Sequence, residues 1–257
     1  MTSSPPIDKS PERIRCMFGA IASRYDLMNH LLSLGIDRSW RKRTVRQLLP
    51  PLTIDGDILD VCCGTGDLSL AFVKQQQKSE TGRINYGIDF SPEMIEIARQ
   101  KAKHVQPLHF SVGDALNLPF EENRFAVVAV AFGLRNVCDV QQGLAEMVRV
   151  CKPGGTVAVL DFSMPVLPVL RQCYRFYFRT VLPRVGQWFA KNREQAYDYL
   201  PESVLQFDKP AELAERLVQI GITGVQVQPM TFGIVTLVWG QKERVSSGVK
   251  MEDVFRC

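Results

Sequence analysis

One stretch of the sequence constrains the fold more than any other: ILDVCCGTGDLSL, residues 58–70. A short apolar run ends in an acid, Asp60, and the chain then turns through Gly64, Thr65 and Gly66 into a helical pattern. Because glycine lacks a Cβ atom, the backbone can turn sharply there and come close to a ligand. The stretch therefore predicts a strand, a loop and a helix, with the loop open to a nucleotide-like cofactor.

Two further acids follow this loop at the ends of predicted strands. INYGID, residues 84–89, ends in Asp89, about 20 residues beyond the glycines, where an acid can accept hydrogen bonds from a ribose diol. LHFSVGDAL, residues 108–116, predicts a third strand that leads to Asp114. In a doubly wound sheet the cofactor lies at the carboxyl ends of the strands, so both acids are expected at the same site.

The middle of the chain alternates between helical and strand patterns. Ser91, followed by a proline and an acid, predicts the start of a helix through residues 94–104. FAVVAVAF, residues 125–132, is a continuous apolar run, typical of a parallel strand buried on both faces. The next helix ends at the breakers of residues 152–155, and residues 156–162 predict another strand. This alternation predicts a doubly wound α/β fold.

The last two apolar stretches change the topology. Residues 224–230 and 232–240 are too close together for a crossover helix, so they are expected to pair as an antiparallel hairpin. The predicted fold class is therefore α/β, with a mostly parallel seven-stranded sheet and an antiparallel C-terminal hairpin. This ending differs from the sheet of a plain dehydrogenase.

Composition narrows the class of protein. Of the 257 residues, 46% are hydrophobic and 23% are charged, as in an ordinary globular domain. The net charge of +4 is too small to indicate nucleic-acid binding. We see no signal peptide and no apolar run near the roughly 20 residues of a transmembrane helix. The seven cysteines contain no CxxC pair, so we expect reduced thiols, no metal site and a cytoplasmic location.

Two cofactors compete for the glycine loop. A dinucleotide fingerprint requires a third glycine where this chain has Ser69, and Asp67 at the helix start would repel a pyrophosphate. S-adenosylmethionine has no phosphate, but it carries an amino group, a sulfonium and a ribose diol, which suit nearby acids. The loop, the acids and the terminal hairpin together favour S-adenosylmethionine over a nicotinamide cofactor.

Several motifs resemble one known family, the ubiquinone/menaquinone biosynthesis C-methyltransferases. They are YDLMNHLLSLGIDRSW at 25–40, FGLRNV at 132–137, RVCKPGGTVAVLDFS at 149–163, YLPESVLQF at 199–207 and the closing strand TFGIVTLVWG at 231–240. The resemblance covers nearly the whole chain outside its ends. It implies a class I (Rossmann-like) methyltransferase fold, S-adenosylmethionine as cofactor and a prenylated naphthoquinol as substrate.

This chain departs from the family pattern at five positions. Asp37 and Val238 stand where the family usually has histidine, and Asp161 where it has glutamate. Cys62 stands where a small residue is common, and Ala131 where a serine is common. Asp161 keeps a carboxylate, whereas Asp37 and Val238 argue against a histidine base at those positions.

The resemblance implies a set of cofactor-binding residues. Asp89 would bind the ribose, Asp60 the methionine end, and Asp114 with Ala115 would flank the adenine. The complete set is Asp60, Gly64, Thr65, Gly66, Asp89, Asp114, Ala115 and Ala131. The alternatives are that the glycines only shape a turn and that Asp60 only caps the following helix.

Methylation of a ring carbon requires a quinol made electron-rich by loss of a hydroxyl proton. Arg135, after the fourth strand, could stabilise the resulting phenolate, and Asn136 could orient a hydroxyl or a water molecule. Tyr25 would come from the N-terminal cover over the site. The alternatives are a structural ion pair for Arg135 and a packed aromatic for Tyr25. No metal is needed.

Domain boundaries follow from composition and the resemblance. Residues 1–11 and 244–257 are predicted to be disordered tails around a single domain, residues 12–243. Within it, residues 12–45 would form a helical cover and residues 164–205 a helical insertion over the substrate site.

Residues 164–190 mix aliphatic, aromatic and basic side chains. They could shelter an isoprenoid tail and contact a membrane surface peripherally, or simply cover the sheet. A homodimer, a ubiquinone-pathway benzoquinol as substrate and a non-catalytic S-adenosylmethionine-binding assembly protein all stay open as alternatives.

Overall fold

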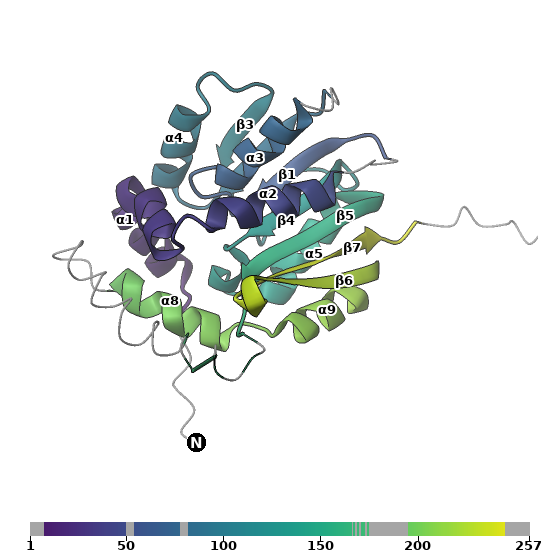
Figure 1. Ribbon diagram of the computed structural model, residues 1–257. Coiled ribbons are helices and arrows are strands. Elements are labelled where there is room, and N and C mark those ends of the chain that lie inside the picture. Colours follow the sequence, from purple (N-terminus) through teal and green to yellow (C-terminus); the bar gives the residue numbers. More distant parts are fainter. Residues whose placement is uncertain are drawn as a thin grey trace, which may run out of the picture.

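The computed structural model describes residues 8–49, 54–77, 82–165, 167, 169, 171–172, 174 and 195–244. At its centre lies a seven-stranded sheet in the order β3-β2-β1-β4-β5-β7-β6 (Figure 1). The strands are β1 Asp57–Val61, β2 Asn85–Asp89, β3 Leu108–Val112, β4 Phe125–Ala131, β5 Cys151–Phe162, β6 Ile222–Met230 and β7 Val235–Lys242. The strands from β3 to β5 pair in parallel, whereas β7 pairs antiparallel with both β5 and β6. The predicted fold class is confirmed.

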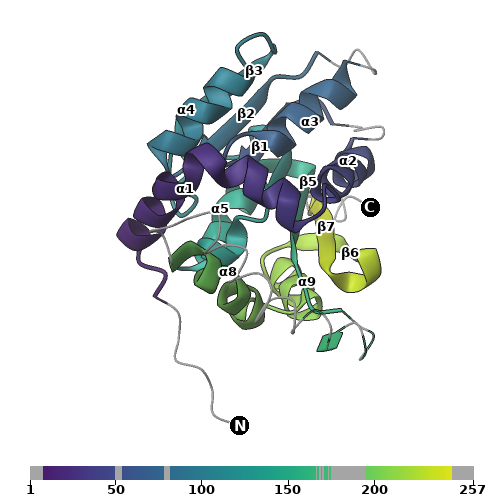
Figure 2. The same ribbon diagram turned by 60° about the vertical axis from the view of Figure 1, so that its left-hand side comes forward.

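Helices cover both faces of this sheet (Figures 1 and 2). On one face α2 and α3 pack through residues such as Trp40 and Phe72, and on the other α5 and α9 pack through Leu144 and Leu217. The helices are α1 Pro11–Leu32, α2 Asp37–Leu48, α3 Asp67–Gln76, α4 Pro92–Lys101, α5 Val140–Val150, α8 Gln195–Gln206 and α9 Pro210–Gln219, with short 3₁₀ turns η1 Leu134–Asn136 and η3 Thr231–Gly233. None of the helices in the described ranges is long and apolar enough to cross a membrane.

The local sequence explains the central elements. In β4 every residue from Phe125 to Val130 is buried, and alternate side chains enter opposite cores: Val127 packs on the α2–α3 side and Val128 on the α5–α9 side. At the start of α4, the Ser91 hydroxyl accepts a hydrogen bond from the Met94 amide at 3.3 Å, and Pro92 occupies the first turn. The apolar run and the serine cap therefore form the structures that the sequence predicted.

The N-terminal part of the chain is helical. The predicted cover, residues 12–45, corresponds to α1 and most of α2, and α1 packs against α4 and α8. Most of the predicted insertion, residues 164–205, lies outside the described residues, and α8 forms its end. Residues 1–7 and 245–257 of the predicted tails also lie outside the described ranges.

Gly66 fixes the entry to α3. Its φ is +83°, and a Cβ atom there would lie 2.6 Å from the Phe110 ring. We expect Gly66→Ala to lower the free energy of unfolding by about 2–4 kcal/mol, because it adds a steric clash to left-handed strain. Gly221→Ala is the matched control, since Gly221 has a φ of +88° but open space around it. Equal shifts in melting temperature for the two variants would contradict the close packing of Gly66.

Candidate active site

The carboxyl ends of β1, β2 and β4 and the loop after β3 surround one cavity, and α1 forms part of its wall. Nine of the eleven residues predicted for the site line this cavity: Tyr25, Asp60, Gly64, Thr65, Asp89, Asp114, Ala115, Ala131 and Asn136. Gly66 and Arg135 do not. Phe90, Met94 and Phe132 also line it, and sequence reasoning did not single them out. The only signal for Phe90 was its place directly after Asp89.

The glycine loop is tied to the end of β2. Cys62, Gly64 and Gly66 all have left-handed backbone angles, which turn the chain sharply between β1 and α3. The Gly64 amide donates a hydrogen bond to Asp89 Oδ2 at 2.8 Å, and the Ser91 amide donates one to Asp89 Oδ1 at 2.9 Å. Burial raises the pKa of Asp89, and these backbone donors oppose that shift. Asp89 therefore holds the loop in place and also lines the cavity.

Asp60 has an unused hydrogen-bonding atom at this cavity. The Ser69 hydroxyl donates to Asp60 Oδ2 at 2.6 Å, whereas Oδ1 is buried with no hydrogen-bond partner in the described part of the chain. Burial raises the pKa of Asp60 from 3.8 to about 7. A buried carboxylate oxygen without a donor is costly. The amino group of S-adenosylmethionine would supply the missing donor, so Asp60 fits the methionine end of this cofactor.

Cofactor binding is expected to depend on pH through Asp60. A cationic amino group favours the ionised form of the Asp60 carboxyl. The affinity for S-adenosylmethionine should therefore rise with pH up to about 7, by as much as about tenfold per pH unit, and should then level off. Conversely, the free protein should lose stability as pH rises from about 4 towards 7, since the folded state holds this proton more tightly than the unfolded chain. Asp60→Asn should flatten both profiles. Calorimetric titrations at several pH values check this, and an unchanged profile in the variant would contradict it.

Tyr25 lies against the glycine loop. Its Cε1 atom lies 3.9 Å from the position of a Cβ built on Gly64, and its ring meets Phe18 edge-on at 6.0 Å between centroids. Burial raises the pKa of the Tyr25 hydroxyl. The hydroxyl thus stays protonated near neutral pH and is suited to donate a hydrogen bond rather than to act as a base.

Arg135 is buried in an ion pair. Its Nη1 atom donates to Asp161 Oδ1 at 2.7 Å and to the Phe132 carbonyl at 2.5 Å, and its guanidinium lies over the Phe162 ring. Only about 4% of the residue is exposed, and it does not line the cavity. These contacts favour the structural alternative for Arg135, with Asp161 as the partner that sequence reasoning missed.

Asn136 lies beside this pair but reaches the cavity. Its Nδ2 atom is 3.5 Å from the Phe132 carbonyl, and its Oδ1 atom is buried without a partner among the described residues. An unpaired acceptor on the cavity wall is suited to bind a ligand hydroxyl. The predicted role of Asn136 in orienting a hydroxyl therefore stays a prediction with geometric support.

Ionic contacts join the helical cover to the cofactor loop. Lys101 of α4 donates to Asp26 of α1 at 2.8 Å, to the Thr65 hydroxyl at 3.2 Å and also to Asp67. The Thr65 hydroxyl donates to Asp26. The sequence did not predict that Lys101 contacts Asp26, Thr65 and Asp67, because these residues lie far apart in the chain.

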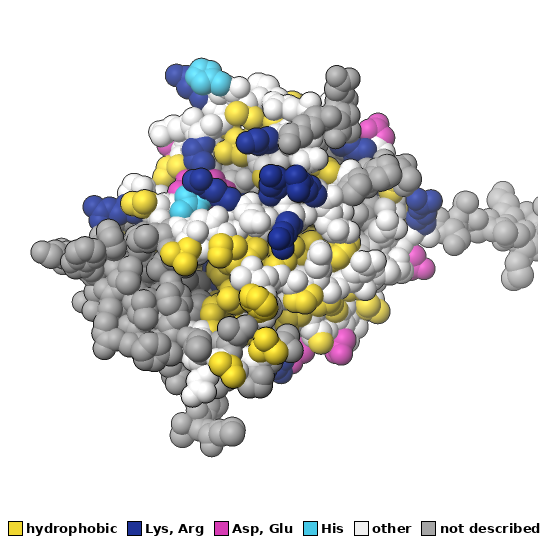
Figure 3. Space-filling model, in the orientation of Figure 1, with side chains coloured by type: hydrophobic (Ala, Val, Ile, Leu, Met, Phe, Trp, Pro, Cys, Tyr) yellow, Lys and Arg dark blue, Asp and Glu magenta, His cyan; other side chains and the backbone are white. Residues whose placement is uncertain are grey.

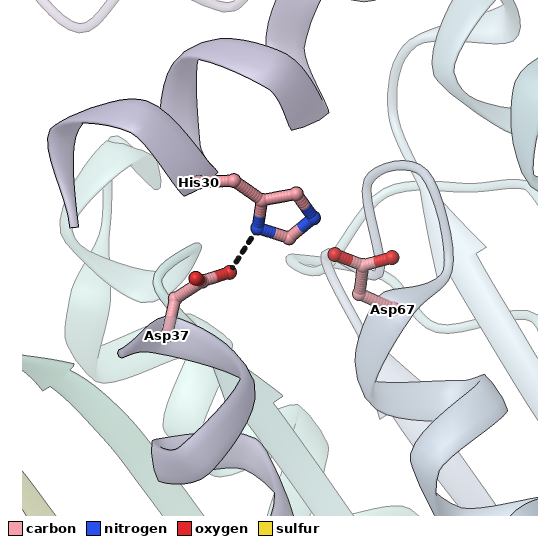
Figure 4. A group of neighbouring side chains, drawn as sticks. All are labelled: His30, Asp37 and Asp67. Carbon is pink, nitrogen blue, oxygen red and sulfur yellow. Dashed lines mark hydrogen bonds and ion pairs between the residues drawn. The ribbon is translucent and has the colours of Figure 1, made fainter. Parts of the chain in front are cut away.

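A second group of these contacts lies between α1, α2 and α3. His30, Asp37 and Asp67 turn their side chains toward one another, and His30 Nδ1 lies 2.8 Å from Asp37 Oδ2 (Figure 4). Arg41 Nη1 lies 2.6 Å from Asp37 and 3.1 Å from Asp67. The three residues have the donor atoms of a metal site, but Arg41 already pairs with both acids and Lys101 pairs with Asp67, so two cations balance the two carboxylates. Asp37 therefore links α1 to α2 through its contacts with His30 and Arg41.

The sheet order, the glycine loop and the acids around one cavity define a class I, Rossmann-like S-adenosylmethionine-dependent methyltransferase. The fold matches a SAM-dependent methyltransferase from Thermotoga maritima with a TM-score of 0.60 at 19% identity, over 90% of this chain and all of that one. It also matches a chain of the complex between a methyltransferase and the Haloferax volcanii activator Trm112, with a TM-score of 0.61 at 20% identity, over 91% of this chain and all of that one. More specifically, the chain belongs to the ubiE/COQ5 methyltransferase family, whose sequence profile matches residues 7–242.

Named relatives are similar along almost their whole length. The ubiquinone/menaquinone biosynthesis C-methyltransferase UbiE of Citrifermentans bemidjiense is 44% identical, over 92% of this chain and 99% of the relative. The demethylmenaquinone methyltransferase of Staphylococcus haemolyticus is 37% identical, over 92% and 96%. The family and the S-adenosylmethionine dependence expected from the sequence are confirmed.

Proposed function

We propose that this protein transfers the methyl group of S-adenosylmethionine to a ring carbon of demethylmenaquinol, giving menaquinol. The observation that carries this proposal is the similarity to demethylmenaquinone methyltransferases of Staphylococcus species, at 37–39% identity over about nine tenths of the chain. The cavity supports it, because its lining combines acids that suit the cofactor, such as Asp60 and Asp89, with polar and aromatic side chains that suit a quinol, such as Asn136 and Phe132.

S-adenosylmethionine, when bound, would supply an electrophilic methyl group. The quinol first loses a hydroxyl proton to water, and the ring carbon beside the resulting phenolate then takes the methyl group as the bond from methyl to sulfonium breaks, which leaves S-adenosylhomocysteine. The ring carbon finally loses its proton to water and the phenolate oxygen regains one, so that one proton is released overall. The residues of the chain have three tasks around this transfer. Asp60 and Asp89 bind the amino group and the ribose, and so align the methyl group. Tyr25, whose hydroxyl is protonated at neutral pH and whose pKa burial raises further, donates a hydrogen bond to the phenolate oxygen. Asn136 accepts a hydrogen bond from the second hydroxyl.

A benzoquinol of the ubiquinone pathway is the second candidate substrate, because several relatives carry a name that covers both quinones. Turnover of a naphthoquinol and a benzoquinol with the same isoprenoid tail decides between them. We expect a higher kcat/KM for the naphthoquinol. A clear preference for the benzoquinol would reverse the assignment, and binding of S-adenosylmethionine without turnover of either quinol would favour an assembly protein.

A further inference from the structure

The exposed face of α2 carries only positive charge. Arg38, Lys42, Arg43 and Arg46 are exposed, whereas the only acid of this helix, Asp37, is buried. Three of the cations repeat every four residues, so they form one stripe along the helix. Figure 3 shows Lys and Arg side chains gathered across the middle of this side of the molecule, with hydrophobic side chains next to them.

Two large apolar side chains beside α2 are held out into solvent by strained turns. Leu34 is 84% exposed with a φ of +52°, and Phe232 is 72% exposed with a φ of +58°. Such left-handed angles are uncommon for residues other than glycine, asparagine and aspartate. Ile36, between Leu34 and α2, is 39% exposed. Strain that presents apolar side chains to water is typical of a functional surface.

One turn is held against α2 by Trp40, and the other leads directly into the helix. The Trp40 indole donates to the Thr231 hydroxyl at 2.7 Å, directly before Phe232. The Trp40 amide donates to the Ile36 carbonyl at 3.1 Å. We call Leu34, Ile36, Arg38, Lys42, Arg43, Arg46 and Phe232 together the α2 face.

The buried side of α2 leads to the active-site cavity. Trp40 packs against Phe132, with ring centroids 6.1 Å apart, and against Phe162 at 6.2 Å. Phe132 and Arg41 line the cavity. Aromatic side chains therefore extend from the cavity wall to the α2 face.

We propose that the α2 face docks on an anionic lipid membrane, with its cations at the headgroups and its apolar side chains in the acyl boundary. Charge complementarity identifies the occupant, since a stripe of cations bordered by protruding apolar side chains fits an anionic bilayer surface. The inference rests on the proposed function in one respect: a substrate with an isoprenoid tail resides in the bilayer. Docking through this face would place the cavity next to that substrate. The residues differ from the predicted membrane segment, 164–190, most of which lies outside the described residues.

Flotation of the full-length protein with phosphatidylcholine vesicles, with and without phosphatidylglycerol, tests this proposal. We expect binding that requires phosphatidylglycerol and weakens with salt. Lys42→Gln/Arg43→Gln should lower the partition coefficient by about 25-fold, at about fivefold per cation. Leu34→Asn/Phe232→Asn should lower it by at least about tenfold. Asparagine tolerates left-handed angles, so this second variant should keep its melting temperature. Val218→Gln is the control, because Val218 is 58% exposed on α9.

Equal binding to neutral and anionic vesicles, or unchanged binding by both double variants, would overturn the proposal. A loss of self-association in these variants without a loss of vesicle binding would also overturn it, because the α2 face would then join two copies of this protein. The Leu34→Asn/Phe232→Asn variant should methylate a short-tailed soluble quinol normally but a long-tailed quinol in anionic vesicles slowly. Vesicle binding by a wild-type protein that methylates no quinol would refute the proposed function and leave the docking intact.

Discussion

Arg135→Ala is expected to lower the free energy of unfolding by about 3–5 kcal/mol, because it leaves the buried Asp161 carboxylate without its cation. Methyl transfer should fall in the same variant, since the ion pair holds the turn that carries Asn136 onto the cavity wall. Thermal melting and single-turnover assays on one preparation measure both effects. Arg135→Lys should recover part of the stability, because an ammonium keeps the charge but not the planar geometry.

The double variant Arg135→Met/Asp161→Leu tests whether Arg135 has a structural or a catalytic role. Removing both charges should restore much of the stability, because no buried charge is left unpaired. If the pair only supports the turn, methyl transfer should recover with stability. An Arg135→Ala protein with a normal melting temperature and turnover about 100- to 1,000-fold slower would instead show that the guanidinium acts on the transition state.

Asp89→Ala is expected to weaken the binding of S-adenosylmethionine by roughly 10- to 150-fold, since hydrogen bonds to a charged group contribute about 1.5–3 kcal/mol. The ribose would lose its acceptor, and the Gly64 amide would lose the bond that fixes the loop. Asp89→Asn, which keeps one acceptor oxygen, should lose less. Isothermal titration calorimetry measures both variants.

The matched control for this experiment is Asp139→Ala. Asp139 also accepts a backbone hydrogen bond at the start of a helix, from the Gln142 amide at 2.9 Å, but it does not line the cavity. It should therefore change cofactor affinity little. Unchanged affinity in a folded Asp89→Ala protein would remove Asp89 from the cofactor site, and tight binding of NADH by the wild type would revive the dehydrogenase interpretation.

Much of the fold could be predicted because its signals are local. The apolar run of β4, the serine cap of α4 and the short link between β6 and β7 each specify their structure within a few residues. Strand ends that carry Asp60 and Asp89 could likewise be assigned to one edge of the sheet, since parallel topology fixes that edge.

The contacts that the sequence did not predict join residues far apart in the chain. Arg135 lies in η1, just after β4, and Asp161 lies near the end of β5, so they meet only because β4 and β5 pair in a particular register. Lys101 and Asp26 are 75 residues apart and depend on how α1 packs against α4. A pattern of single residues gives no distance between side chains of separate elements, so the sequence predicted neither the ion pair of Arg135 with Asp161 nor the position of Arg135 outside the cavity lining.

The most direct test of the proposed reaction is methyl transfer from labelled S-adenosylmethionine to reduced demethylmenaquinone, with the product located by mass spectrometry. We predict incorporation of one labelled methyl group on the quinone ring, dependent on reduction of the quinone and strongly reduced in Asp89→Ala. A folded protein that binds S-adenosylmethionine but transfers no label to the naphthoquinol ring would contradict this account.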